Sequence, residues 1–557
     1  MARLIIWFKE SISNIKRNQN AYILTLLASF GGMLFGWDTG LIGGVLTMES
    51  FQRSFALRNT TLEEQRKFSS ISGNIVSVLQ AGCFFGAMSS YYLSHHFGRK
   101  NALMQGTFIF LLGSILQTCS GINTTSLTLL YIGRIVGGLG VGLVSAVVPT
   151  YIGENTNKDI RGRCIGTMQL FNCSGIMISF FVNYWIVSSA VTGTSLEWRI
   201  PFALQMIPGF LLLAGLVTQY ESPRWLIMKR REIEAQVVLR HLGGKSTNEA
   251  NLLREFNEIN ADLQGHQDLS PRKQIMASFE NRKVFYRVTM GAILMFWQQW
   301  TGTNSINYYA PQIFSSIGLR GQKTELLATG MYGVVKKCMA MLTLLLAIEQ
   351  IGRKYSLMIS SAGQAFCMLY IGMQNALASN STDSSLSGPG IFAILCVYLF
   401  VVFFSLGWGL VPYVLSAEIS PNHLRSLSMA LSLMMQWINN FIIARLVPIM
   451  LNRIGYGTFI FFGNCSILCF LFAMLCVPET AGVPLERIYL LYEENVLKGA
   501  FLDIFPRFRR SNKLAKNTEV EDSNSASNSC PESGLAPEFG SQTGSNVIHS
   551  AKSIQIR

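Results

Sequence analysis

Long apolar runs recur along the chain, separated by short segments that carry most of the charged residues. A helix of about 20 mostly apolar residues is long enough to cross a hydrocarbon layer roughly 30 Å thick. Twelve such runs lie between residues 21 and 477, and each predicts a transmembrane helix. The predicted spans are residues 21–46, 72–93, 101–119, 128–152, 163–188, 201–219, 284–316, 327–348, 355–376, 391–417, 424–450 and 457–477.

Charged motifs at the ends of these runs occur twice along the chain. Each motif of the first six runs returns in the last six after 254 to 264 positions. The matching pieces are Gly98-Arg99-Lys100 and Gly352-Arg353-Lys354, Glu154 with Arg161 and Glu418 with Arg425, and Glu221 and Glu479. The agreement predicts a duplicated six-helix bundle with a ligand site between its halves, a plan typical of transporters in which one half rocks against the other.

The repeat and the local composition divide the chain into five segments. The residues between the halves mix charged and apolar side chains, which predicts short amphipathic helices. The tail is rich in Ser, Asn, Gly and Glu, which predicts that it is largely disordered. The segments are a cytoplasmic N-terminal segment (1–20), a first half (21–221), a cytoplasmic helical linker (222–283), a second half (284–477) and a cytoplasmic tail (478–557). The predicted fold class is an all-α membrane protein of twelve transmembrane helices in two six-helix halves.

Composition and charge placement support this topology. Hydrophobic residues make up 50% of the chain and charged residues only 14%, against about 25% charged residues in soluble domains. The net charge of +14 comes from Lys and Arg that gather before the first span and in the linker, where they predict cytoplasmic loops rather than nucleic-acid binding. We expect a multi-pass plasma-membrane protein with both termini cytoplasmic, and the glycosylation acceptors Asn59, Asn123 and Asn380 fall in predicted external loops.

Motifs for other chemistry are missing from the sequence. The eleven cysteines lie mostly in apolar spans and lack metal-ligand spacing, so packing is the favoured role. We find no phosphate-binding loop and no nucleophile with a base and an orienting group. The sequence therefore predicts no enzyme, no metal and no cofactor, and its expected partners are a small-molecule substrate, the lipid bilayer and, as a further candidate, a proton.

Six motifs together carry a family resemblance. They are Phe35-Gly-Trp-Asp-Thr-Gly40, Gly133-Arg134, Pro149-Thr-Tyr-Ile-Gly-Glu154 with Arg161-Gly162, Glu221-Ser-Pro-Arg224, Gln298-Gln-Trp-Thr-Gly-Thr-Asn304 and Pro478-Glu-Thr480. With them the chain resembles the sugar porter family of the major facilitator superfamily over residues from about 21 to 490. Gly333-Val-Val-Lys336 looks most like a fungal branch with monosaccharide and quinate permeases. The resemblance implies alternating-access transport of a hexose or pentose by proton symport, with a quinate or polyol transporter as the alternative.

Four positions depart from the family pattern. His95 stands where an Asp usually precedes Gly-Arg-Lys, and Tyr220 replaces the first Pro of Pro-Glu-Ser-Pro-Arg. Tyr413 replaces a Trp of span ten, and Gln205 stands where some bacterial proton symporters have a Glu. These changes affect expectations about gating, aromatic contacts and proton coupling rather than the fold.

Amide side chains inside the spans are the candidate substrate site. A sugar hydroxyl both donates and accepts, so its site needs groups that also do both, together with an aromatic face. The alternative is that each amide only holds helices together, at roughly 0.6 kcal/mol apiece. By resemblance and by residue type, the candidate substrate-binding residues are Gln169, Gln298, Gln299, Asn304, Tyr413, Gln436, Trp437 and Asn440.

A carboxylate in the middle of the first span is the candidate for coupling. Asp38 would cost roughly 2.5–3.5 kcal/mol in the membrane if charged and unpaired, so it needs a partner or a proton. The resemblance implies Arg134 as that partner. Competition between Arg134 and a proton for the Asp38 carboxylate would couple protonation to conformation. The alternative is a static ion pair in a facilitator.

The repeated charged motifs predict gates at the cytoplasmic ends of the halves. Acidic residues contribute little to topology, so the two glutamates need a role other than anchoring. We expect ion pairs that hold the halves together when the cytoplasmic side is closed, formed by Arg99, Glu154, Arg161, Arg353, Glu418 and Arg425.

Two adjacent lysines within the eighth span are unusual. Lys336 and Lys337 point about 100° apart on a helix, so they serve different purposes. We expect Lys337 to face the central cavity, where a cation suits an anionic polyol acid such as quinate. The alternative is that one lysine neutralises a buried carboxylate such as Asp38 and the other snorkels or packs between helices.

A sugar sensor that does not transport is the rival class of function, and an uptake assay separates it from a carrier.

Overall fold

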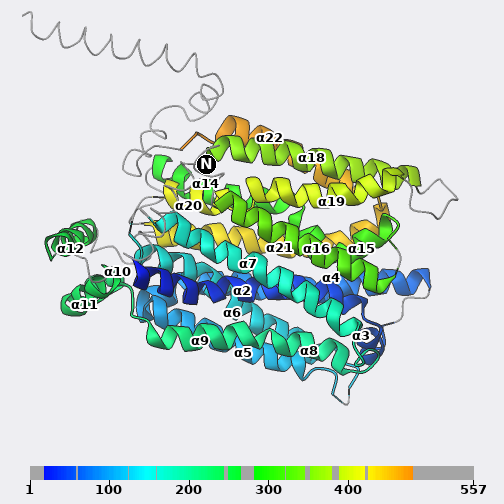
Figure 1. Ribbon diagram of the computed structural model, residues 1–557, viewed down its shortest axis with the longest axis horizontal. Coiled ribbons are helices and arrows are strands. Elements are labelled where there is room, and N and C mark those ends of the chain that lie inside the picture. The colour runs from blue at the N-terminus through cyan, green and yellow to red at the C-terminus, as the bar shows by residue number, and fades with distance from the viewer. Residues whose placement is uncertain are drawn as a thin grey trace, which may run out of the picture. The chain divides into compact units, whose positions relative to one another are not determined.

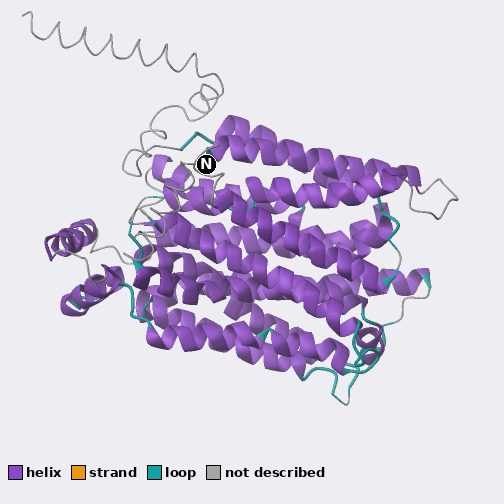
Figure 2. Cartoon of the chain, viewed as in Figure 1, coloured by secondary structure: helices purple, strands orange, loops and turns teal. Residues whose placement is uncertain are grey.

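The computed structural model describes residues 18–57, 61–122, 124–157, 160–243, 249–264, 282–319, 321–344, 352–378, 388–420 and 424–480. They belong to one unit, Met1–Phe501. All secondary structure in this part of the chain is helical (Figures 1 and 2). The acceptors Asn59, Asn123 and Asn380 and the tail from residue 481 on lie outside the described residues.

The described residues of the first predicted half form eight helices. They are α2 (Gln19–Thr47), α3 (Glu49–Ser54), α4 (Leu62–Phe97), α5 (Arg99–Thr118), α6 (Thr128–Glu154), α7 (Arg161–Val187), α8 (Leu196–Leu204) and α9 (Met206–Thr218). Helix α4 begins ten residues before the predicted span, because Thr61 and Glu64 form a capping box at its N-terminus. Helices α2 and α7 pack so closely that a Cβ atom at Gly36 would lie 2.0 Å from the Asn172 carbonyl oxygen.

The described residues of the second predicted half also form eight helices. They are α14 (Arg282–Trp300), α15 (Thr303–Ser316), α16 (Gln322–Leu342), α18 (Arg353–Ala378), α19 (Gly388–Leu406), α20 (Val411–Ile419), α21 (Arg425–Ile454) and α22 (Gly457–Cys476). Between the halves lie the short helices α10 (Pro223–Met228), α11 (Glu232–Gly243) and α12 (Glu249–Gln264), as the composition of this segment predicts. We call the end of the bundle that carries them the linker side (Figure 1).

Three predicted spans are each interrupted. The span at 284–316 divides into α14 and α15 at Gly302, whose φ of +87° favours glycine. Pro208 follows the break between α8 and α9, and Pro412 follows the break between α19 and α20. A proline lacks the N–H that would bond the carbonyl four residues earlier, so both breaks have a local cause.

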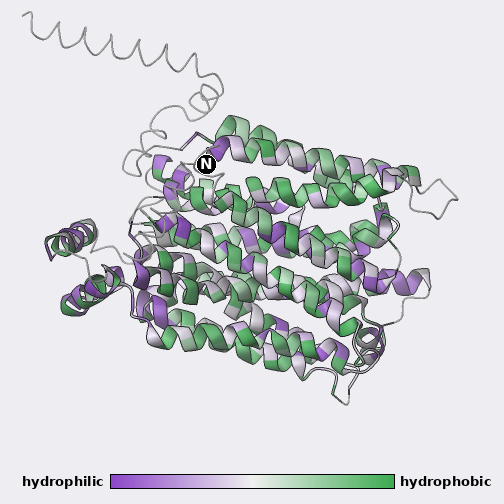
Figure 3. Ribbon diagram, viewed as in Figure 1, coloured by the Kyte–Doolittle hydropathy of each residue, from purple (hydrophilic) through white to green (hydrophobic). Residues whose placement is uncertain are grey.

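The long helices are apolar enough for a membrane. Among the described residues, nine helical segments have the length and hydropathy of a membrane span. Green, hydrophobic positions run along the bundle helices in Figure 3. The other predicted spans are also helical, as α5, α14 with α15, and α16. These helices carry more polar residues, and the site described below lies largely on them.

Helices from the two halves contact one another directly. Helix α4 packs against α21, and α7 packs against α16. Away from the linker side, the Arg445 guanidinium of α21 donates to the Ser70 carbonyl oxygen of α4 at 2.6 Å. These contacts place side chains of both halves around a shared interior.

Candidate functional site

A chain of hydrogen-bonded amides begins where α14 ends. The Gln298 Nε2 donates to the Trp408 carbonyl oxygen at 2.8 Å, and the Gln298 Oε1 lies 3.5 Å from the Gln299 Nε2. Asn304, at the start of α15, donates to the Gln299 Oε1 at 2.6 Å. The Gly302 turn between the two helices brings these amides together, and all three are buried.

The amide chain continues into α15 and α21. Asn304 also donates to the Asn440 Oδ1 at 3.1 Å, and Asn440 donates to the Tyr308 hydroxyl at 2.9 Å. That hydroxyl lies 2.9 Å from the Gln80 side-chain amide of α4. The chain therefore crosses from the second half of the bundle to the first.

Asn307 gives the network a second branch. Its Nδ2 donates to the Asn304 Oδ1 at 2.9 Å. Its Oδ1 accepts from the Lys336 Nζ at 3.0 Å and from the Tyr332 hydroxyl at 3.3 Å. A buried ammonium is thus joined to the amides by one side chain.

Two narrow cavities lie at the contact between the halves. The first is lined by Gln169 and Cys173 of α7, Lys336 of α16 and Ser405 of α19, among others. Lys336 lines this cavity and Lys337 does not, so the prediction that Lys337 faces the cavity is wrong. The first lysine of the pair is therefore the one that faces inward on α16.

The second cavity contains the predicted aromatic residues. Its lining includes Gln169, Tyr413, Gln436 and Trp437. The Gln436 Nε2 donates to the Tyr413 hydroxyl at 2.8 Å. The Trp437 indole donates to the Ser145 Oγ at 3.3 Å, across the contact between the halves. Of the eight predicted substrate residues, four therefore line cavities and the other four form the amide network behind them.

The buried ion pair predicted from the sequence is present. The Arg134 Nη1 lies 3.3 Å from the Asp38 Oδ1, and the Arg134 Nη2 lies 3.5 Å from the Asp38 Oδ2. The side chains are 0% and 3% exposed. Both distances are long for a charge-assisted hydrogen bond, which is typically about 2.7–2.9 Å. Because Asp38 pairs with Arg134, it does not need Lys336 as its counter-ion.

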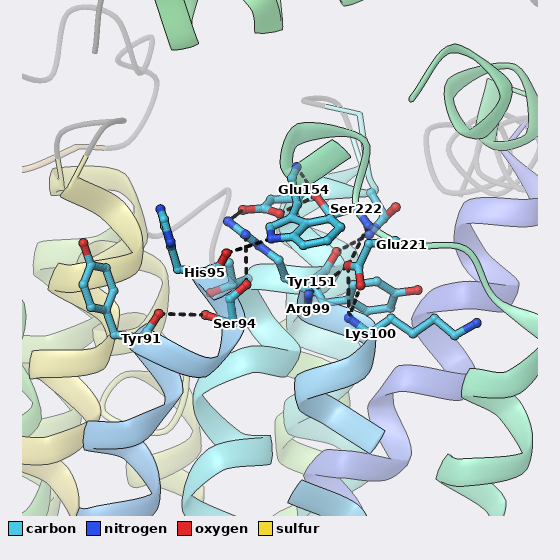
Figure 4. Close-up of polar contacts among 12 residues, drawn as sticks. Tyr91, Ser94, His95, Arg99, Lys100, Tyr151, Glu154, Glu221 and Ser222 are labelled. Atoms are coloured by element: carbon cyan, nitrogen blue, oxygen red, sulfur yellow. Dashed lines mark hydrogen bonds and ion pairs between the residues drawn. The ribbon is translucent and has the colours of Figure 1, made fainter. Parts of the chain in front are cut away.

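Polar clusters hold the linker side of each half. In the first half, the Arg99 Nη2 lies 2.9 Å from the Glu154 Oε1, and Ser222 donates to the other Glu154 oxygen (Figure 4). In the second half, the Arg353 Nη2 lies 3.2 Å from the Glu418 Oε1. Each predicted glutamate is therefore paired with the predicted arginine of its own half.

The other two predicted gating arginines, Arg161 and Arg425, are not seen in an ion pair with a glutamate among the described residues. Arg161 donates to the Thr156 carbonyl oxygen at 3.5 Å, and the ion pairs found among the described residues do not include it. Arg425 begins α21, but its side chain lies outside the described part of the chain.

Comparison with known proteins decides the family. The family model described as "Sugar (and other) transporter" matches residues 24–492, which is most of the chain. The chain belongs to this sugar transporter family. Its amide network, its buried ion pair and its two linker-side clusters are therefore parts of a membrane transporter of the major facilitator type.

Individual relatives and solved structures are also similar to this chain. A "probable quinate permease" of Aspergillus fumigatus is 36% identical over 512 residues, which is 91% of this chain and 93% of that protein. One of Aspergillus terreus is 35% identical over 515 residues, with 91% and 93% covered. The proton:xylose symporter XylE bound to 6-bromo-6-deoxy-D-glucose aligns with a TM-score of 0.72 at 28% identity, over 85% of this chain and 100% of that one. The fold predicted from the sequence is confirmed.

Several residues of this sugar transporter's site escaped the sequence analysis. Asn307 lies three residues after Asn304 on the same helix, and this spacing was the available signal. Gln80 and Tyr308 join the amide network to the first half, and nothing in their spacing along the chain indicates that they meet.

Proposed function

We propose that this protein moves a small polyhydroxylated compound across the plasma membrane by alternating access. The observation that carries the proposal is the amide chain that runs from Gln299 to Gln80, because it joins both halves through groups that donate and accept. A ligand that replaces some of these bonds would favour one arrangement of the halves over another. A monosaccharide, either a hexose or a pentose, has the chemistry that such a site needs.

A polyol acid is the second candidate substrate. Lys336 lines the first cavity, and the relatives named above are called quinate permeases. Quinate carries several hydroxyl groups and one carboxylate, so it suits amides with a cation nearby. The two candidates share the amide site and differ in whether they use the lysine.

Proton coupling is part of the proposal. Asp38 and Arg134 form a buried ion pair at 3.3 Å. The solved structure named above, which has a similar fold, is that of a proton:xylose symporter. Protonation of Asp38 would release Arg134 and change the balance between conformations. The linker side would then be the cytoplasmic side, with both termini cytoplasmic, as the cationic residues of the linker favour.

An uptake assay in cells stripped of their own sugar carriers tests the proposal. Labelled glucose, xylose, a polyol and quinate are supplied with and without a proton uncoupler. We expect uptake of at least one compound, and loss of accumulation when the uncoupler is added. Uptake that ignores the uncoupler would make the protein a facilitator, and no uptake of any compound at normal surface abundance would favour a sensor.

A further inference from the structure

Lys336 is a buried cation, and among the described residues no carboxylate forms an ion pair with it. Its side chain is 4% exposed, and the ion pairs formed within 4.0 Å by the described residues leave it out. An ammonium taken out of water is costly unless it is paired and hydrogen-bonded. Its contacts with described residues are the Asn307 Oδ1, which lies 3.0 Å from the Nζ, and the face of the Phe404 ring, whose centroid lies 5.7 Å away.

The cavity beside Lys336 has the polarity of a site for one negative charge. Its lining residues are otherwise uncharged and include the amide of Gln169 and the hydroxyl of Ser405. They come from α7 in the first half and, in the second half, from α16, from α19 and from the segment between α19 and α20. A single cation among neutral donors and acceptors complements a molecule with one carboxylate and several hydroxyl groups.

The hydrogen bond to Asn307 orients the lysine without neutralising it. A lysine ammonium has three donors, and this bond uses one of them. Asn307 is held in turn by its bond to Asn304, so the ammonium is fixed relative to the amide network. One ligand could therefore contact the amide network and the Lys336 ammonium at the same time.

We propose that Lys336 binds a carboxylate of the transported compound, so that the substrate class is a hydroxylated monocarboxylate rather than a neutral sugar. This inference rests on the proposed transport function. It assigns the anion to the first cavity, between α7 and α16, and leaves the hydroxyl groups to the neighbouring amides. The carboxylate of the bound compound and the Lys336 ammonium would then form a buried pair with no net charge of its own.

The test compares quinate with its uncharged methyl ester, which keeps the ring and its hydroxyl groups. Affinities are measured on the purified full chain in proteoliposomes, by competition against a labelled substrate, with glucose as a neutral reference. The variants are Lys336→Met, which removes the charge, and Lys336→Arg, which keeps a cation. Lys337→Gln is the matched control, because Lys337 is the adjacent lysine and does not line the cavity.

We expect the wild type to prefer quinate over the ester by roughly 10- to 100-fold, which is the range of a charge-assisted hydrogen bond. Lys336→Met should reduce this ratio to about one, because quinate loses more affinity than the ester does. Lys336→Arg should keep part of the preference, and Lys337→Gln should keep all of it.

Three results would overturn the inference. An unchanged ratio in Lys336→Met would place the carboxylate elsewhere. Equal loss of quinate, ester and glucose would assign Lys336 to gating or stability. A wild type that transports glucose and ignores quinate and other hydroxylated carboxylates would refute the inference and leave the proposed transport function intact, whereas the absence of all transport would refute the transport function itself.

Discussion

Arg99 and Arg353 hold equivalent positions in the two halves of the molecule. The Arg99 backbone N–H donates to the Glu221 Oε1 at 2.8 Å, and that of Arg353 donates to the Glu479 Oε1 at 2.9 Å. The lysine after each arginine donates its side chain to a carbonyl oxygen, at 2.7 Å for Lys100 and 2.8 Å for Lys354. The two linker-side clusters repeat almost bond for bond.

The interiors of the halves do not repeat. Inside the first half lies a charged pair, Asp38 with Arg134, whereas inside the second lie Gln299, Asn304 and Asn440. We propose that both linker-side clusters close the transporter, which would explain why their geometry is nearly the same in the two halves. The interior faces have separate tasks, which we propose are coupling in the first half and recognition in the second. Substitutions in each half test this division of tasks.

The largest effect is expected from Asp38→Asn. This change removes the charge that a proton would titrate and leaves a side chain of the same shape. A proton that enters down 100 mV contributes ~2.3 kcal/mol, which supports roughly 50-fold accumulation. We expect accumulation to fall to equilibrium while exchange of labelled for unlabelled substrate continues in vesicles.

Two measurements decide this prediction. Accumulation and counterflow are compared in the same vesicles, so that a folding defect, which lowers both, is distinguished from uncoupling. Undiminished accumulation in Asp38→Asn would show that the proton does not act at Asp38, and the pair with Arg134 would then be structural.

A smaller effect, on affinity, is expected from Gln299→Ala in the second half. The change leaves the Asn304 Nδ2 without its 2.6 Å partner and opens the amide network. Loss of one buried polar partner costs about 1–3 kcal/mol, so the apparent KM should rise roughly 10-fold or more. Gln364→Ala is the control, because Gln364 is also buried, and its hydrogen bond among the described residues goes to the Ser360 hydroxyl in its own helix.

Surface abundance distinguishes the two glutamine variants. Gln299→Ala should raise KM at nearly normal abundance, and Gln364→Ala should change abundance more than KM. Unaltered uptake kinetics in Gln299→Ala would remove this glutamine from the site and weaken the assignment of recognition to the second half.

The sequence predicted the helical spans and the repeated motifs better than it predicted which side chains meet in the interior. Spans, repeats and the pairs of Arg99 with Glu154 and of Asp38 with Arg134 depend on hydropathy and on motifs, which are local in the chain. The error at Lys336 and Lys337 depends on how α16 is rotated about its axis. Neighbouring residues point about 100° apart, so a small error in rotation exchanges one lysine for the other. Hydropathy does not fix that rotation in a helix with polar groups on several sides.

Contacts between the two halves were also not predictable from the sequence. Gln80 and Tyr308 meet although 228 positions separate them, and only the packing of α4 and α15 around a common interior brings them together. The break at Gly302 was also missed, because a glycine within an apolar run is compatible with a continuous helix until its φ is known.

Glycines before the two arginines provide a test of the repeated frame. Gly98 has a φ of +98°, and a Cβ atom there would lie 2.3 Å from the Glu221 Oε2. Gly352 has a φ of +88°, with the Glu479 Oε2 at 2.6 Å from such an atom. Gly193→Ala is the control for backbone strain, since its φ is +86° and nothing lies within 4 Å. Strain alone costs about 1 kcal/mol, and we expect about 1 kcal/mol more in Gly98→Ala and Gly352→Ala.

Thermal unfolding of the purified variants measures this difference. The ranking should place Gly98→Ala and Gly352→Ala together and Gly193→Ala above both in stability. Equal stability of all three would show that the glutamates move aside without loss, and the clusters would then contribute little to closure.

The smallest effect should distinguish the two clusters from each other. The Arg99 and Glu154 side chains are 8% and 12% exposed at 2.9 Å, whereas those of Arg353 and Glu418 are 17% and 19% exposed at 3.2 Å. A shorter and drier pair interacts more strongly, since water screens it less. Double-mutant cycles with Arg→Gln and Glu→Gln changes in each pair isolate the interaction energy from other effects of each substitution. We expect roughly 1–2 kcal/mol for the first pair and about half as much for the second, read from thermal unfolding of the purified protein. Equal energies, or a stronger second pair, would mean that the small difference in burial between the halves has no functional weight, and the two clusters would then be equivalent halves of one gate.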